Sequence, residues 1–195
     1  MNWQDVKSYD DLKIATIAFI KGDLKETPYH AGSLEDEDLV PLLVRLNNFG
    51  LVTYDGQQGL VLFHNDKPKQ WQRSYVSFIV PYSERWRKVE NNLATDPRVD
   101  VVIYDSRKGR EKQNLVVYAV RNNNLTKYID ETGNMVYYTN IPKPIWGQDE
   151  EIADEQWHHA PNIKNMLKRG HYRYVTLALR EYGVPGIENV LLGYL

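Results

Sequence analysis

The chain is 195 residues long and carries 24 basic and 26 acidic side chains, so its formal net charge is -2. The sequence contains no cysteine, which excludes a disulfide scaffold, cysteine-ligated zinc, an iron–sulfur cluster and thiol catalysis. A chain of this length can bury a hydrophobic core without such cross-links. We therefore expect a single domain that spans residues 1–195.

We expect neither a targeting segment nor a membrane span in the N-terminal region. Residues 1–11 are acidic and lack the basic-then-apolar order of a signal peptide. The apolar stretch at residues 14–20 contains Thr16 and is far too short to cross a bilayer. From these features we expect a soluble protein in the cytoplasm or in another intracellular compartment.

Local signals predict helices and short strands in the first half of the chain. Ser8 or Asp10 can cap a helix that ends near Lys21. A second helix is expected to end at Asn47, and Pro41 must lie in its first turn, although Ser33 offers an earlier cap. β-like runs follow at residues 51–54 and 60–64, which we expect to pair as a hairpin, and at residues 74–80.

The second half continues the same mixed pattern. Ser83 predicts the start of a helix over residues 83–94, and strands 99–104 and 115–120 are expected to form a hairpin with a polar tip. Strands at 135–139 and 172–179 and helices at 161–169 and 185–192 complete the order. Residues 140–161 are predicted to be a long surface loop. This irregular order favours an α+β fold with a largely antiparallel sheet and helices packed on one face.

One segment carries a recognisable pattern between residues 28 and 80. Its elements are Gly32, Glu35, Leu39-Val40-Pro41, Leu46-Asn47, Gly50, Thr53, Gln57, Gly59 and Gln72-Arg73. This order resembles an uncharacterised domain family known mainly from bacterial proteins. The chain departs from that pattern at Gly56, where the family has serine, and at Gln58, where it has proline. The resemblance implies a shared fold segment and a shared site, but no activity.

Four neutral polar residues of this segment form the first candidate ligand site: Asn47, Thr53, Gln57 and Gln72. Short connections place a helix end, a strand, a glycine-flanked turn and the next strand at one end of the sheet. Amide groups offer paired donors and acceptors that suit a polar ligand. In the alternative interpretation, the same groups only tie a tight turn to a helix end.

Residues before the second helix extend this candidate site. Tyr29 and His30 lie in a glycine-containing loop, and with Glu35 they could bind a ligand or act as an acid–base pair. An isolated loop histidine without such a role is the simpler interpretation.

A basic hairpin tip is the candidate contact for nucleic acid. Residues 64–121 contain 12 basic and 7 acidic side chains, and Arg107, Lys108, Arg110 and Lys112 lie at the tip. These side chains could contact phosphates, and the rings of His171, Tyr172 and Tyr174 could stack on bases. The modest total charge favours a solvated turn instead, because nucleic-acid-binding domains are usually strongly basic.

No motif identifies a metal, a cofactor or a reaction. Adjacent His158 and His159 cannot easily chelate one ion, and the chain has no phosphate-binding loop, dinucleotide fingerprint or nucleophile elbow. We therefore expect a non-enzymatic binding or interaction module with neither metal nor cofactor. It would recognise a protein partner or a small polar ligand without binding a membrane, and a homodimer is one form it could take. The alternative is a small enzyme that acts on a nucleotide, amide or glycosyl bond.

Overall fold

The computed structural model describes residues 2–24, 39–64, 67–107, 109–110, 118–121, 135–138 and 160–195. In chain order these residues form η1 (Trp3–Asp5), α1 (Tyr9–Ile20), α2 (Val40–Asn48), β1 (Val52–Gln57), β2 (Leu60–His64), β3 (Lys67–Pro81), α3 (Glu84–Thr95), β4 (Val99–Asp105), β5 (Gly109–Arg110), β6 (Tyr118–Arg121), β7 (Met135–Tyr138), α5 (Pro161–Arg169), β8 (Tyr172–Tyr182) and α6 (Ile187–Leu192). The predicted α+β class is confirmed.

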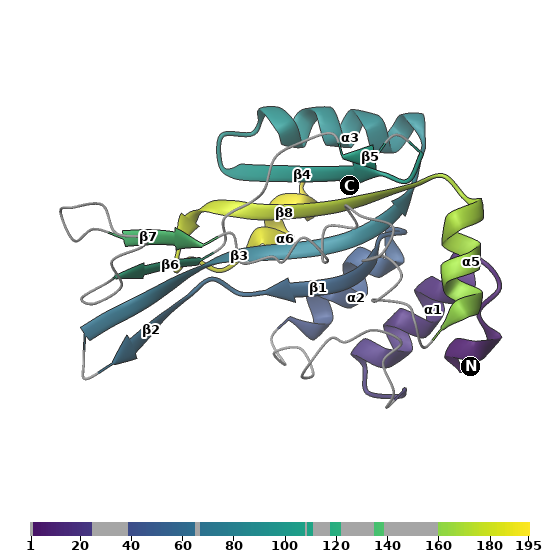
Figure 1. Cartoon of the computed structure of the whole chain (residues 1–195), viewed down its shortest axis with the longest axis horizontal. Coiled ribbons are helices and arrows are strands. Elements are labelled where there is room, and N and C mark those ends of the chain that lie inside the picture. Colours follow the sequence, from purple (N-terminus) through teal and green to yellow (C-terminus); the bar gives the residue numbers. More distant parts are fainter. Residues whose placement is uncertain are drawn as a thin grey trace.

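β3 is the strand on which the sheet is built (Figure 1). Its C-terminal part lies between β1 and β8, and β8 pairs in turn with β4, which pairs with β5. Its N-terminal part lies between β2 and β6, and β6 pairs with β7. All of these pairings are antiparallel, which confirms the largely antiparallel sheet that the sequence predicts.

Two predicted hairpins have different partners in the structure. β1 and β2 do not pair with each other, because each pairs with its own stretch of β3. The described part of the second hairpin also differs, since β4 pairs with β5 and β8 whereas β6 pairs with β3 and β7. β3 begins at Lys67 rather than near Ser74, and this extra length supplies the partners for β2 and β6. Long-range pairing therefore overrides the expectation that consecutive strands are neighbours.

Helices cover both faces of the sheet rather than the single face that we expected. The larger apolar cluster joins α2, α3 and α6 to Val76, Phe78 and Val80 of β3. The second cluster joins η1, α1 and α5 to Ile79 of β3 and to the β8 residue Tyr174. Because successive strand residues point to opposite faces, Phe78 and Ile79 belong to different layers. β3 therefore carries apolar residues on both of its faces, without a strict alternation of apolar and polar residues.

Local capping explains where the helices begin. The Ser8 hydroxyl accepts a hydrogen bond from the Asp11 backbone N–H, and the Ser83 hydroxyl accepts one from the Trp86 backbone N–H. Pro161 begins α5, where its missing N–H costs no helical hydrogen bond. Pro41 lies in the first turn of α2, as the sequence requires, while Ser33 lies outside the described residues. None of the helices in the described ranges is long and apolar enough to span a bilayer.

β8 has polar groups at each of its ends. Its first residues lie beside the end of β4, and the chain that follows it, residues 183–188, lies beside the turn between β1 and β2. Of the predicted surface loop at 140–161, only residues 160 and 161 are among the described residues.

Candidate functional site

The structure brings the four predicted amide and hydroxyl residues together as two separate pairs. Asn47 donates from Nδ2 to the Leu43 carbonyl at 2.8 Å and to Thr53 Oγ1 at 2.7 Å. Its Oδ1 accepts the Thr53 backbone N–H at 3.3 Å. Both residues are buried, so this pair ties the end of α2 to β1.

The second pair lies at the turn between β1 and β2. The buried Gln72 donates from Nε2 to Gln57 Oε1 at 2.5 Å and to the Gln58 carbonyl at 3.2 Å. Gln57 is exposed and Gln58 is half-buried, so the outer side of this turn faces solvent. Of the four predicted residues, Gln57 is the one with an exposed side chain.

The remaining predicted contacts fall mostly outside the described residues. Tyr29, His30 and Glu35 lie there, as do Lys108 and Lys112. Arg107 is exposed at the end of β4, and Arg110 is described only as part of the backbone of β5. Tyr172 and Tyr174, whose rings could have stacked on bases, are buried in the core instead.

An ionic network that the sequence did not predict lies where β4 ends and β8 begins. Asp105 is the last residue of β4, and it pairs in register with Arg173 near the start of β8. Glu90 reaches the same place from α3, and His171 directly precedes β8. The topology therefore brings two acids and two bases from three elements into one cluster.

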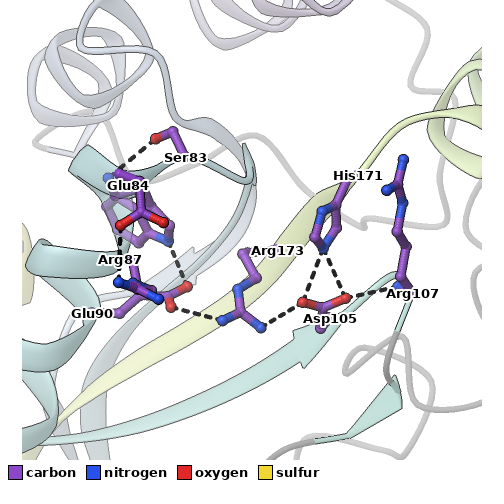
Figure 2. Close-up of polar contacts among 9 residues, drawn as sticks. Ser83, Glu84, Arg87, Glu90, Asp105, Arg107, His171 and Arg173 are labelled. Carbon is purple, nitrogen blue, oxygen red and sulfur yellow. Dashed lines mark hydrogen bonds and ion pairs between the residues drawn. The ribbon is translucent and has the colours of Figure 1, made fainter.

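Figure 2 shows how Arg173 joins the two acids. Its guanidinium lies 2.8 Å from Asp105 Oδ2 and 3.2 Å from Glu90 Oε2. The second Glu90 oxygen accepts the Trp86 indole N–H at 2.6 Å. The side chains of Arg173 and Glu90 are each 5% exposed and that of Asp105 is 0% exposed. Charges this deeply buried need such partners, because an isolated ion in the interior is strongly destabilising.

His171 is the exposed end of this network, with 21% of its side chain accessible. Its Nε2 lies 3.0 Å from each Asp105 oxygen (Figure 2). Its ring stacks on Tyr82 at 4.4 Å between centroids, and the Arg173 guanidinium lies 5.2 Å from the same Tyr82 ring. The imidazole is thus held at its edge and on its face.

These contacts assign the proton of the neutral His171 ring. Asp105 is paired with Arg173 and also accepts the Arg107 backbone N–H at 2.8 Å, which favours the ionised carboxylate. A carboxylate only accepts hydrogen bonds, so Nε2 carries the proton and Nδ1 is the acceptor. Nδ1 makes no hydrogen bond with any residue in the described ranges.

A second polar cluster lies on the face of the sheet that Ile79 shares. The Ser77 and Thr176 hydroxyl oxygens are 2.7 Å apart and buried, and both bond to the Tyr54 hydroxyl. Burial raises the pKa of Tyr54 well above its ordinary value. Burial also raises the pKa of the neighbouring Asp55 to about 6, although the Tyr75 hydroxyl and the Gly56 backbone N–H partly oppose this shift. The hydroxyl groups of this cluster form hydrogen bonds with one another and are buried. They are therefore a weaker candidate for ligand binding than the partly exposed His171.

The chemistry available at the β4–β8 site is that of an oriented imidazole. A carboxylate behind a histidine fixes its tautomer and its orientation, and leaves the other ring nitrogen as an acceptor. Within the described ranges, no group of three histidine, cysteine, aspartate or glutamate residues is placed to hold a metal ion. The site can therefore accept a hydrogen bond or a proton from a bound molecule.

Sequence reasoning missed Asp105, Glu90 and Arg173. Asp105 closes the apolar strand VDVVIYD, and Arg173 lies just inside the apolar strand that follows Gly170. A charge inside a buried strand signals a buried partner. Which strands are neighbours could not be read from the pattern, so these charges could not be paired in advance.

Comparison with known proteins gives a family but no activity. No curated protein matches the chain. A family model described as Domain of unknown function (DUF6919) matches residues 1–141 and so contains the whole segment 28–80 in which the resemblance was predicted. Glu90 and Asp105 lie inside the matched range, whereas His171 and Arg173 follow it. Because the match covers more than half of its length, the chain belongs to this family of unknown function.

Proposed function

We propose that the protein is a binding module for a small polar ligand and that the exposed edge of His171 contacts this ligand. The observation that carries the proposal is the unused Nδ1 of a ring that Asp105 and Tyr82 already hold in place. Binding to a preorganised acceptor loses little conformational entropy, because the side chain is ordered before the ligand arrives.

The geometry also indicates the chemistry of the ligand. An acceptor at Nδ1 calls for a hydroxyl or an N–H donor. Arg107 is exposed and follows Asp105 by two residues, and Lys108, Arg110 and Lys112 come next in the sequence. A ligand that also carries an anionic group would gain from this positive charge. Nucleosides and nucleoside monophosphates combine these features, and free sugars and primary amides offer the donor alone.

The test is a titration followed by imidazole ¹⁵N NMR and by thermal melting. Nucleosides, nucleoside monophosphates, hexoses and primary amides are added separately at pH 7.5. We expect at least one class to shift the His171 Nδ1 resonance and to raise the melting midpoint. His171→Phe keeps a ring against Tyr82 but has no nitrogen, so it should bind about tenfold more weakly, the loss of roughly one hydrogen bond.

His158→Phe removes a different imidazole and serves as the matched control, with unchanged binding expected. The proposal is wrong if no class moves the His171 resonance. It is equally wrong if His171→Phe binds the active class as tightly as the unaltered chain does.

A second candidate function is a small acid–base enzyme, which the Asp105–His171 pair favours specifically. In this case His171 Nδ1 would take a proton from the bound hydroxyl or amide, as in other carboxylate-oriented histidines. Steady product formation from one member of the same panel would support it. His171→Phe should then lower the rate by about 10²–10⁴-fold. Binding without turnover would leave the binding module as the function.

A further inference from the structure

The turn between β1 and β2 is fastened to the segment that follows β8. The Gly183 backbone N–H donates to the Gln72 carbonyl at 2.8 Å, and the Gly186 backbone N–H donates to Gln58 Oε1 at 3.2 Å. Gly59 lies so close to Val184 that a Cβ there would overlap the Val184 backbone. The turn 57–59 therefore packs against residues 183–186, which precede α6.

Glu188 lies beneath this turn, in the first turn of α6, and it is completely buried. Neither of its carboxyl oxygens receives a hydrogen bond in the structure. Burial raises the pKa of this carboxyl, although its own backbone N–H and the adjacent Gln58 side chain partly oppose the rise. Neither of these two neighbours meets hydrogen-bond geometry, so the carboxyl is left without a full partner.

A buried carboxyl without a partner needs a physical explanation, because almost all buried polar groups are hydrogen-bonded. The other buried acids that the structure describes are paired with arginines: Glu90 and Asp105 with Arg173, and Asp96 with Arg98. Apolar packing alone would favour leucine or methionine at this position over glutamate. Since the residues that the structure describes supply no such hydrogen bond, a bound molecule is the partner that we consider.

We propose that Glu188 is the anchor of a second binding site, beneath the turn 57–59, for a small molecule that carries a primary ammonium group. One positive charge matches the single carboxylate. The three N–H donors of an ammonium group match the two Glu188 oxygens together with the second lone pair of the Gln58 side-chain oxygen, whose first accepts the Gly186 N–H. A divalent metal ion would require more acidic ligands than this place offers.

Access to Glu188 depends on the Gln58 side chain. Gln58 is half-buried, and one hydrogen bond, from the Gly186 N–H, holds its side-chain oxygen. Rotation of this side chain exchanges one neutral hydrogen bond for a charge-assisted one between ligand and carboxylate. This site lies at the opposite end of β8 from His171, so the two proposals stand independently.

Methylammonium chloride is the probe, with tetramethylammonium chloride and potassium chloride compared at equal ionic strength. Tetramethylammonium has the same charge but no N–H donor. We expect methylammonium alone to raise the melting midpoint in a saturable way, by about 2–4 °C at five times its Kd. It should also shift the Glu188 side-chain carboxyl ¹³C resonance.

Glu188→Gln keeps the shape of the side chain and removes its charge, so the melting response to methylammonium should disappear. Glu181→Gln, on the exposed end of β8, is the matched control and should respond as the unaltered chain does. An equal response to potassium or tetramethylammonium overturns the proposal, as does a full response in Glu188→Gln. If that variant fails to fold, the ¹³C titration of the unaltered chain decides the question alone.

Discussion

The two ends of β8 bury carboxyl groups in opposite ways. At its start, Asp105 contacts Arg173, His171 and the Arg107 backbone N–H, and every partner belongs to the chain. Beyond its other end, Glu188 is equally inaccessible and neither oxygen is hydrogen-bonded. The first end gives each buried acid a partner within the chain and presents one histidine to solvent, whereas the second leaves its carboxyl without a hydrogen bond. Asp105 thus orients a neighbouring side chain, whereas Glu188 is the group to which we propose that a ligand binds.

Asp55 is intermediate between these two cases. It is half-buried on β1, and its side-chain contact to the Tyr75 hydroxyl is long, at 3.3 and 3.4 Å. Burial raises the Asp55 pKa to about 6, because the Tyr75 hydroxyl and the Gly56 backbone N–H offset it only in part. Hydrogen-bonded partners supplied by the chain therefore decrease from Asp105 through Asp55 to Glu188.

The largest effect is expected from Arg173→Met near the start of β8. This change leaves Glu90 and Asp105 buried without their shared cation, and removing one partner of a buried ion pair costs about 3–5 kcal/mol. Urea denaturation measures the free energy of unfolding. A loss below about 1 kcal/mol would mean that the network contributes little to stability. The partners of the buried acids at the start of β8 would then not distinguish this end from the end near Glu188.

Asp55→Asn should change how stability depends on pH. The Asp55 pKa is higher in the folded chain, about 6 against 3.8, so the folded state holds this proton more tightly. Stability from this group is complete below pH 4 and falls as the pH rises through 6, by at most about 3 kcal/mol. The free energy of unfolding, measured for both chains at pH 4 and at pH 7.5, should fall less for Asp55→Asn than for the unaltered chain as the pH rises. Parallel pH profiles for the two chains would contradict the raised pKa.

Asn47→Ala tests the neutral pair that ties α2 to β1. It removes the contacts to Leu43 and Thr53 and leaves the Thr53 backbone N–H without its acceptor, which should cost about 1–3 kcal/mol. A double-mutant cycle with Thr53→Val measures the coupling between the two side chains by urea denaturation. If both single variants keep full stability, the pair is not a structural tie and its use as a ligand site gains support.

Signals that act over a few residues were predictable from the sequence. The caps at Ser8 and Ser83 and the prolines of α2 and α5 place helix starts to within a few residues. Each depends on backbone groups only one helical turn away.

Contacts that depend on strand neighbours were not predictable. Asp105 meets Arg173 only because β4 pairs with β8, across a separation of 68 residues. The same limit hid Glu188, which the sequence shows as one acid in the short apolar segment GIENVLLG. Its neighbour Gln58 lies far away in the sequence, and this side chain contacts Gly186 across 128 residues.

The smallest effect is expected from Arg180→Met on the same strand as Arg173. The Arg180 Nε lies 2.9 Å from Asp100 Oδ1, but 55% of the arginine side chain is exposed. Water already solvates this cation, and Asp100 keeps its second partner, Arg73, at 2.6 Å. An exposed pair of this kind contributes about 0.2–1 kcal/mol, and salt should weaken it further. Arg173 and Arg180 both pair with aspartates of β4, but they differ in burial and in the number of acids that lose a cation. A loss for Arg180→Met that equals the loss for Arg173→Met would show that neither burial nor the second acid adds to the cost.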